Sequence, residues 1–460
     1  MDWDDYLSPF TWRYGSEEMR SIWSETSKRR LLRRFWVALA KAQCKAALVS
    51  QAQVDDLVAH KDDIDIPKAL EIEADIKHDL MAEIKTYESQ CPVGGSIIHL
   101  GATSMDALDN ADAIRLKDSA DLIIRRLKDL LGALKARIDQ TADYPCMAFT
   151  HLQSAEPTTI GYRLSQYAQD LLEDLEGLKA LRIKAKGLKG AVGTCASYVQ
   201  LLRSKDMSAS ELEDLVMKDL GLEAFDAATQ VYPRKQDLRI MQALSALACS
   251  TARLAMDFRM LQSSAIGEWS ESFSAHQVGS SAMPFKRNPI NCEKVSSLSR
   301  YVNSLLSNAW DNASLSILER TLDDSANRRI FLSEAFLCCD EILITMAKVI
   351  GNMDIHSVNI QQNFSKYGVF ASTEILLMEA VKKGANRQSM HEVIRQKSLK
   401  AWSDVQSGLP NHLREELASD PEVNKFIDAS EAYALLDAEA YTGLAGSKAK
   451  AMSRRIAEAL

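Results

Sequence analysis

Apolar residues recur every three or four positions over five long stretches of the chain. The first stretch runs from Leu116 to Ile138, and the others cover residues 164–178, 241–261, 295–309 and 332–349. This spacing places apolar side chains along one side of an α-helix, whereas a half-buried strand would alternate every second residue. Near-heptad spacing also lets helices pack at shallow angles. The pattern predicts an all-α fold around an elongated five-helix bundle between about residues 105 and 356.

The segments on either side of the predicted bundle show shorter apolar periods. Residues 1–104 indicate short helices, for example over 28–49 and 71–88, and residues 357–460 indicate a second short-helix region. We therefore predict three helical domains, at 1–104, 105–356 and 357–460. Chemistry is expected in the polar segments between the long helices, because such connections carry most functional residues. These segments are 91–106, 144–159, 187–200, 226–237, 267–292 and 319–329.

Composition and charge exclude several classes of protein. The 460 residues carry a formal net charge of −8, whereas a nucleic-acid-binding protein usually shows a basic stripe. The longest stretch without charged residues, 89–105, contains proline and glycine and predicts no membrane span. The scattered cysteines and histidines suggest neither disulfides nor a metal site. Because the N-terminus also lacks a secretory signal, we expect a cytoplasmic protein that uses no metal or other cofactor.

One loop concentrates groups with chemical uses. Residues 279–289 are Gly-Ser-Ser-Ala-Met-Pro-Phe-Lys-Arg-Asn-Pro. A bare connector rarely needs this combination, although a solvated loop that caps the helix from Ile290 would have a similar composition. The loop resembles the Gly-Ser-Ser-x-Met-Pro-x-Lys-x-Asn-Pro signature of the aspartase/fumarase superfamily, whose members release fumarate from succinyl-type substrates. The resemblance implies three mostly helical domains and a homotetramer with a twenty-helix core.

Two further segments resemble the adenylosuccinate lyase family within that superfamily. They are residues 97–104, Ile-Ile-His-Leu-Gly-Ala-Thr-Ser, and residues 319–329, Glu-Arg-Thr-Leu-Asp-Asp-Ser-Ala-Asn-Arg-Arg. The resemblance implies a carbon–nitrogen lyase of purine biosynthesis that binds small molecules, and neither nucleic acid nor a membrane. Its expected substrates are adenylosuccinate, which gives AMP and fumarate, and the succinylated aminoimidazole carboxamide ribotide (SAICAR), which gives AICAR and fumarate.

The resemblance assigns two opposite proton transfers to His151 and Ser280. His151 matches the general acid, and Glu293 matches the carboxylate that orients it. A carboxylate-held imidazole titrates near neutrality and can protonate a leaving nitrogen. Ser280 matches the general base that removes the Cβ proton. Because a free serine is a poor base, nearby charge and backbone amides must stabilise its alkoxide.

The other matched residues are implied to hold the substrate and its developing charge. Lys286 and Asn288 are expected to bind the succinyl carboxylates, and His78 matches a second active-site histidine. The remaining matched positions are Arg13, Tyr14, Lys77, Asp79, Thr103, Ser104, Gln230, Lys294, Arg320, Ser325 and Arg329. Without the resemblance, His151 would pass for a core histidine and His78 for a helix-surface residue.

Some residues depart from the family pattern, and other functions stay open. Lys294 and Lys77 stand where arginine is common, and Ser154 replaces a proline. A lysine offers a point charge where arginine offers a two-pronged fork, so these changes bear on substrate preference more than on reaction type. The alternatives are argininosuccinate lyase or another fumarate-releasing lyase, and a structural protein on the same scaffold, as lens crystallins are.

Overall fold

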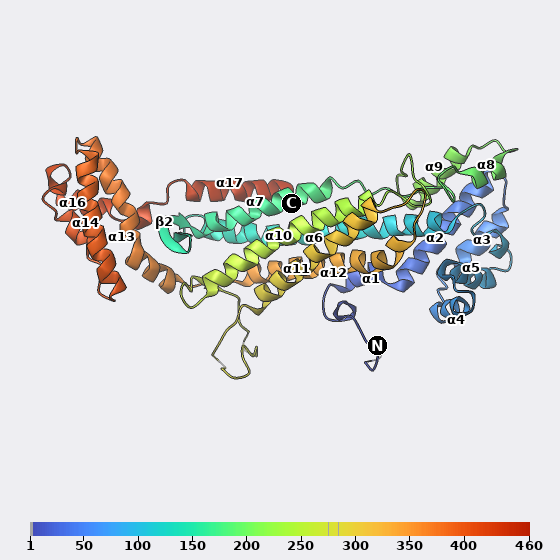
Figure 1. Cartoon of the computed structure of the whole chain (residues 1–460), viewed down its shortest axis with the longest axis horizontal. Helices are drawn as coiled ribbons and strands as arrows, with labels where there is room; N and C mark the ends of the chain where they lie inside the picture. The colour runs from blue at the N-terminus through green and yellow to red at the C-terminus, as the bar shows by residue number, and fades with distance from the viewer. Residues whose placement is uncertain (1–2, 275, 284) are drawn as a thin grey trace. The chain divides into compact units, whose positions relative to one another are not determined.

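The protein is almost entirely helical (Figure 1), which confirms the predicted all-α fold. The computed structural model describes residues 3–274, 276–283 and 285–460, so Pro284 of the signature loop lies outside the described residues. Two short antiparallel sheets accompany the helices. One pairs β1 (Pro145–Thr150) with β2 (Gln153–Thr159), and the other pairs β3 (Trp269–Ser270) with β4 (Asp354–Ile355).

The five long helices lie where the apolar spacing predicted them. They are α6 (Ser104–Thr141), α7 (Ile160–Lys179), α10 (Lys235–Gln262), α11 (Ile290–Ser314) and α12 (Asp323–Asn352). Their apolar stripes are buried, as Leu116, Leu127 and Leu134 of α6 illustrate. Burial of one such side chain contributes roughly 2 kcal/mol, so each stripe stabilises its helix far more than helix propensity does. Because α12 begins at Asp323, much of segment 319–329 is helical and not the predicted loop.

Contacts divide the chain into two compact units. The first comprises residues up to 126, 174–249 and 298–343, and the second comprises 127–173, 250–297 and 344–460. All five long helices contribute segments to both units. The predicted domain boundaries at 104 and 356 stay a prediction. Among the described residues, every helix is too short or too polar for a transmembrane span.

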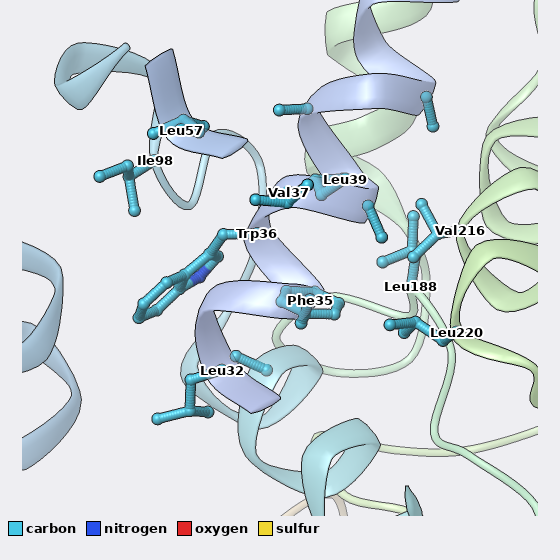
Figure 2. Packing of buried hydrophobic residues seen from close by; sticks show 14 of the residues in the cluster. Leu32, Phe35, Trp36, Val37, Leu39, Leu57, Ile98, Leu188, Val216 and Leu220 are labelled. Atoms are coloured by element: carbon cyan, nitrogen blue, oxygen red, sulfur yellow. The ribbon is translucent and has the colours of Figure 1, made fainter. Parts of the chain in front are cut away.

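The short helices of the first unit pack around α2 (Glu25–Lys45). In Figure 2, Phe35 lies toward Val216 and Leu220, whereas Trp36 points away from them, so α2 is buried on more than one side. Serine residues cap several helices here; Ser24, for example, accepts the Ser27 amide at the start of α2. The other elements are η1 (Pro9–Thr11), α1 (Glu17–Trp23), α3 (Gln51–His60), α4 (Ile66–Ile76), α5 (Asp79–Gln90), η2 (Gly95–Ile97), α8 (Ala196–Leu202) and α9 (Ala209–Leu220).

The single helix predicted over residues 71–88 is wrong, because the chain breaks between α4 and α5. Lys77 has a φ of 56°, a left-handed conformation that ends α4. His78 is extended, and its Nδ1 accepts the Met81 amide at 3.3 Å, which caps α5. Neither glycine nor proline marks the break, so apolar periodicity alone could not reveal it.

The second unit contains the β1–β2 hairpin and the C-terminal helices. Leu376, Leu413 and Leu436 belong to its C-terminal core. The prediction of only short helices after residue 357 is wrong, because α13 (Ser357–Lys382) has 26 residues and α14 (Arg387–Gln406) has 20. The two pack together in the orange-red part of Figure 1. The remaining elements are α15 (Leu413–Ala418), η3 (Val423–Lys425), α16 (Ala429–Leu435), η4 (Ala438–Ala440) and α17 (Ala445–Ala459).

Candidate active site

The structure gathers three predicted substrate-binding residues in one pocket of the first unit. Arg320, Ser325 and Arg329 line a pocket of about 150 Å³ at the start of α12. Gln230 lies beside this segment, because its backbone N–H donates to the backbone carbonyl of Glu319 at 3.2 Å. Arginine dominates the charged lining, and its planar fork suits phosphate or carboxylate oxygens. The lining also contains Glu25 and Asp112, so cations outnumber carboxylates in it.

Buried ion pairs hold Arg320 in place. Asp324 accepts from Arg320 Nη1 and from Arg234 Nε, both at 2.7 Å, and Arg234 Nη1 also donates to Asp109 at 3.0 Å. Burial by itself would raise the pKa of Asp324, but the charges of Arg234 and Arg320 outweigh burial and lower this pKa below its usual value. Asp324 therefore stays ionised and fixes the direction of Arg320.

Arg328, the neighbour of Arg329, belongs to the buried support of the pocket. Its Nε donates to Asp237 at 2.7 Å, and its Nη2 donates to the Tyr232 hydroxyl at 2.7 Å. The residue pattern alone did not predict these buried ion pairs. One residue could have revealed the network in the sequence. Asp109 lies seven residues, or two helical turns, before Leu116, so its carboxylate lies on the apolar side of α6, where it requires a cationic partner.

We expect Asp324→Asn to weaken both stability and substrate binding. The substitution removes a charge that two arginines share, and an unpaired buried charge costs about 3–5 kcal/mol. Denaturant unfolding near pH 7 should show this loss, and KM should rise more than kcat falls. Because the folded pKa of Asp324 lies below the reference value of 3.8, its contribution is present above that pH and disappears as the pH falls through the folded pKa. The difference in stability between wild type and variant should therefore shrink in acid; a constant difference would contradict the assignment.

Arg329 also meets the segment that carries the second predicted histidine. Its Nη2 donates to Asp79 Oδ2 at 2.9 Å. Burial would raise the pKa of Asp79, but the charge and hydrogen bond of Arg329, the Leu80 amide and the charge of Lys28 together lower this pKa below its usual value. His78 follows the left-handed Lys77 and lies with its Nδ1 3.9 Å from Asp79 Oδ1. Because Nδ1 accepts the Met81 amide, neutral His78 carries its proton on the other nitrogen, Nε2.

Thr103 and Ser104 lie at the N-terminus of α6, the end of a helix whose dipole favours an anion. Asp106 fixes this turn from inside. Its Oδ2 accepts from the Thr103 amide at 3.0 Å and from the Tyr198 hydroxyl at 3.1 Å, and its Oδ1 lies 2.6 Å from Lys186 Nζ. Asp106, Lys186 and Tyr198 are all fully buried, so the turn is rigid.

His99 lies in the same loop and was not predicted as a site residue. Its Nδ1 accepts the indole N–H of Trp36 at 3.1 Å, which places the imidazole proton on Nε2. Burial lowers the pKa of His99 to about 4, and the negative charge of Asp106 opposes this only in part. His99 is therefore neutral near pH 7 and offers an N–H donor in the loop that carries Thr103.

Arg13 and Tyr14 are matched positions that do not line the pocket of Arg320. They follow η1, and Arg13 is exposed. The next residue, Gly15, has a φ of 78° and lies so close to α12 that a Cβ there would be 2.8 Å from Leu337 Cδ2. A residue with a Cβ would be strained at this φ and would crowd Leu337. The contact between Gly15 and α12 therefore fixes the position of the preceding residues, Arg13 and Tyr14.

His151 lies at the tip of the β1–β2 hairpin in the second unit. Thr150 pairs with Gln153, so His151 and Leu152 form a two-residue turn, with φ values of 55° and 59°. Hairpins usually meet this requirement with Asn-Gly, and other residues pay roughly 1–2 kcal/mol each. The sequence predicted only a polar segment over 144–159, and no Asn-Gly pair marks the hairpin. Backbone strain of this kind clusters at functional sites, and the imidazole is exposed at the tip.

Ser280 accepts two backbone hydrogen bonds within the signature loop. The amides of Ala282 and Met283 donate to its Oγ at 3.3 and 3.1 Å. Two N–H groups directed at one oxygen stabilise negative charge on it, which is the support that an alkoxide base requires. Gly279 permits this closure, because a Cβ there would lie 2.3 Å from the Lys286 carbonyl oxygen.

The loop between α10 and α11 is fixed at its end and exposed along its length. Glu271 accepts from Asn291 Nδ2 at 2.7 Å and from the Cys292 amide at 2.8 Å, which caps the first turn of α11. Val278 is 78% exposed and Phe285 is 82% exposed. Figure 1 shows the yellow loop extending away from both helix ends. The signature loop therefore presents two large apolar side chains to its surroundings.

The predicted partners of His151 and of the substrate lie at the base of this loop. Glu293 is in the first turn of α11, with its Oε1 3.9 Å from Arg259 Nη2. Within the described residues, Glu293 has no hydrogen bond to His151. Asn288 precedes the helix, and Lys294 is half-buried on it. The described residues also contain no group of three His, Cys, Asp or Glu side chains that could hold a metal.

Comparison with known proteins identifies the family. A family model described as lyase matches residues 15–303, and a model described as adenylosuccinate lyase C-terminus matches residues 368–451. The adenylosuccinate lyase of Schizosaccharomyces pombe is 36% identical over 100% of this chain and 96% of that protein. The chain belongs to the adenylosuccinate lyase family. Membership makes it a lyase and confirms the resemblance seen in its sequence.

A second relative agrees with this membership, and solved structures show the same fold. The adenylosuccinate lyase of Archaeoglobus fulgidus is 34% identical and aligns over 99% of each chain. The crystal structure of 3-carboxy-cis,cis-muconate lactonizing enzyme from Pseudomonas putida has a TM-score of 0.85 and 23% sequence identity to this chain. The match covers 98% of this chain and 99% of that enzyme's chain. A fumarate lyase from Mesorhizobium sp. BNC1 has a TM-score of 0.83 at 20% identity, covering 98% and 99%. These structures show the shared fold.

Proposed function

We propose that this chain eliminates fumarate from adenylosuccinate to give AMP, and from SAICAR to give AICAR, in purine biosynthesis. Membership of the adenylosuccinate lyase family supports this reaction, and the pair of amides directed at Ser280 Oγ supports Ser280 as its base. Ser280 as an alkoxide takes the Cβ proton, and the electron pair forms an aci-carboxylate that Lys286 and Asn288 stabilise. The C–N bond then breaks as His151 protonates the leaving nitrogen.

The arginine-lined pocket favours a phosphorylated substrate. Arg320 is held by Asp324, and Arg329 lies beside it in the same lining. A local group of arginines attracts an anion even though the chain carries a net charge of −8. A guanidinium can donate two hydrogen bonds to a phosphate, and argininosuccinate has no phosphate. This pocket therefore favours the purine substrates over argininosuccinate.

We also propose a cytoplasmic homotetramer whose active sites combine residues from several subunits. Bundle helices of the single chain leave large apolar side chains exposed, among them Trp310, Ile330 and Met256. Four copies with closed symmetry would bury such surfaces, together with the apolar residues of the signature loop. All eight cysteines are free thiols, as is usual in a reducing compartment.

A spectrophotometric assay of AMP formation from adenylosuccinate tests the activity. We expect turnover of adenylosuccinate and of SAICAR, and none of argininosuccinate. Turnover of argininosuccinate alone would establish the alternative lyase. A folded protein that eliminates fumarate from none of the three would support a structural role on this scaffold.

Glu293→Gln should lower kcat by about 10- to 100-fold, less than the roughly 10²–10⁴-fold that loss of a general acid costs in His151→Ala. A carboxylate partner raises the pKa of a histidine, so its replacement by an amide lowers that pKa. The limb of the pH profile of kcat that reports the protonated imidazole should therefore move to lower pH. A profile that does not move would contradict the pairing of Glu293 with His151.

A further inference from the structure

A groove of about 620 Å³ in the second unit lies between the β1–β2 hairpin, α7 and α17. Its walls include the aromatic rings of Phe149 and Tyr162, and three cationic side chains complete it: Arg163, Lys448 and Arg455. Its described lining contains no carboxylate and shares no residue with the pocket of Arg320. The groove thus combines aromatic surface with positive charge.

The two cations that α17 contributes keep their charge available to a ligand. Lys448 Nζ lies 5.8 Å from the centre of the Tyr162 ring, and Arg455 Nη1 donates to the neutral Gln169 Oε1 at 2.6 Å. Neither cation forms an ion pair in the described part of the chain. Lys450 on the same helix differs, because it pairs with an aspartate at 2.6 Å. Lys448 and Arg455 therefore bring charge that no carboxylate in the described residues neutralises to the groove.

The floor of the groove is joined to the strand that leads to His151. The Arg163 guanidinium is paired with a buried glutamate at 2.7 Å, donates to the Met147 carbonyl of β1, and lies 5.8 Å from the Phe149 ring. The strand register shifts between Met147 and Phe149, where Ala148 faces both Ala155 and Glu156, so the bulge lies on β2 and Ala148 lines the groove opposite it. Bulges of this kind redirect neighbouring side chains near active sites. An occupant would contact β1 two residues before the strand ends at the His151 turn.

We propose that this groove is a second small-molecule site, which binds an aromatic anion. A flat ring lies against Tyr162 and Phe149, and its phosphate or carboxylate lies between Lys448 and Arg455. Occupancy changes turnover through β1 and the His151 turn. This effect on turnover rests on the proposed function, whereas binding to the groove does not.

Calorimetric titration with phenyl phosphate tests the binding, with inorganic phosphate and phenol as probes that each lack one feature. Phenyl phosphate should bind at least tenfold more tightly than either. The double variant Lys448→Glu/Arg455→Glu should lose at least tenfold in affinity. Arg454→Glu, an exposed position of α17 outside the groove, is the matched control and should bind normally. Unchanged binding in the double variant would overturn the proposal, as would loss of the phenyl phosphate signal in Arg329→Ala, which would place the ligand in the arginine pocket.

Kinetics test the coupling to His151 separately. At saturating adenylosuccinate, phenyl phosphate should change kcat of the wild type at least twofold and leave that of the double variant unchanged. A change in KM alone, or the same change in both proteins, would overturn the coupling. If the chain turned over none of the substrates tested, the calorimetric result would still decide whether the groove binds aromatic anions.

Discussion

Ser280→Ala should abolish turnover, with a loss of at least 10³-fold in kcat, and leave substrate binding and the helical CD spectrum nearly intact. The hydroxyl is the only part of the side chain that the substitution removes, and it is the group at which the Ala282 and Met283 amides are directed. Proton transfer by a positioned group contributes about 10²–10⁴-fold, and stabilisation of charge by oriented amides a further 10²–10³-fold. Ser280 lies in an exposed loop, so the change removes no core packing.

Ser281→Ala is the matched control, because it removes the same atom from the adjacent residue. Ser281 is exposed, and the two amides are directed at its neighbour. We expect kcat of this variant to fall by less than about tenfold, because the general base is still present. Assay of AMP formation and calorimetric titration with adenylosuccinate separate turnover from binding. If Ser281→Ala were inactive and Ser280→Ala active, the base would be Ser281.

The long helices were predictable because their signal is periodic and their stabilisation comes from the buried stripe. Features that depend on a single backbone conformation were not. The left-handed Lys77 splits the helix predicted over 71–88, and the strained turn at His151 turns a polar segment into a hairpin. Both conformations are costly for residues other than glycine, and tertiary contacts rather than local sequence hold them in place. Lys77 and His151 are both candidate site residues, so the local structure of the candidate site was less predictable than the long helices.

The sequence motifs identified the candidate site residues, but they did not reveal the ion pairs and hydrogen bonds that hold those residues in place. Arg329 looked the same as Arg328 in the sequence, yet Arg328 is buried against Asp237 while Arg329 lies on the pocket surface. His99 was visible within its motif, whereas its neutral state follows from burial and from its bond with Trp36. Charge pairing between distant segments has no signature in one sequence without the fold.

Assembly from two inactive variants should restore activity. His151→Ala and Ser280→Ala proteins, each inactive alone, are mixed under dissociating conditions and then reassembled. If each site draws His151 and Ser280 from different chains, random mixing in equal amounts gives about one quarter of the sites both intact residues. We therefore expect recovery to about 25% of wild-type activity, measured as AMP formation per tetramer, with the tetramer confirmed by light scattering.

The matched control for this experiment is a mixture of His151→Ala with the double variant His151→Ala/Ser280→Ala. It passes through the same dissociation and reassembly, but none of its sites can contain an intact imidazole, so no activity should return.

The structure gives the reason to expect complementation. His151 is exposed at the tip of its hairpin and lacks a hydrogen bond to Glu293 in the described residues, and the loop of Ser280 exposes Val278 and Phe285. If the hairpin tip of one copy contacts the Ser280 loop of another copy, both exposed surfaces become covered. Recovery equal to that of the control mixture, or a fully active monomer, would show that one chain builds the whole site.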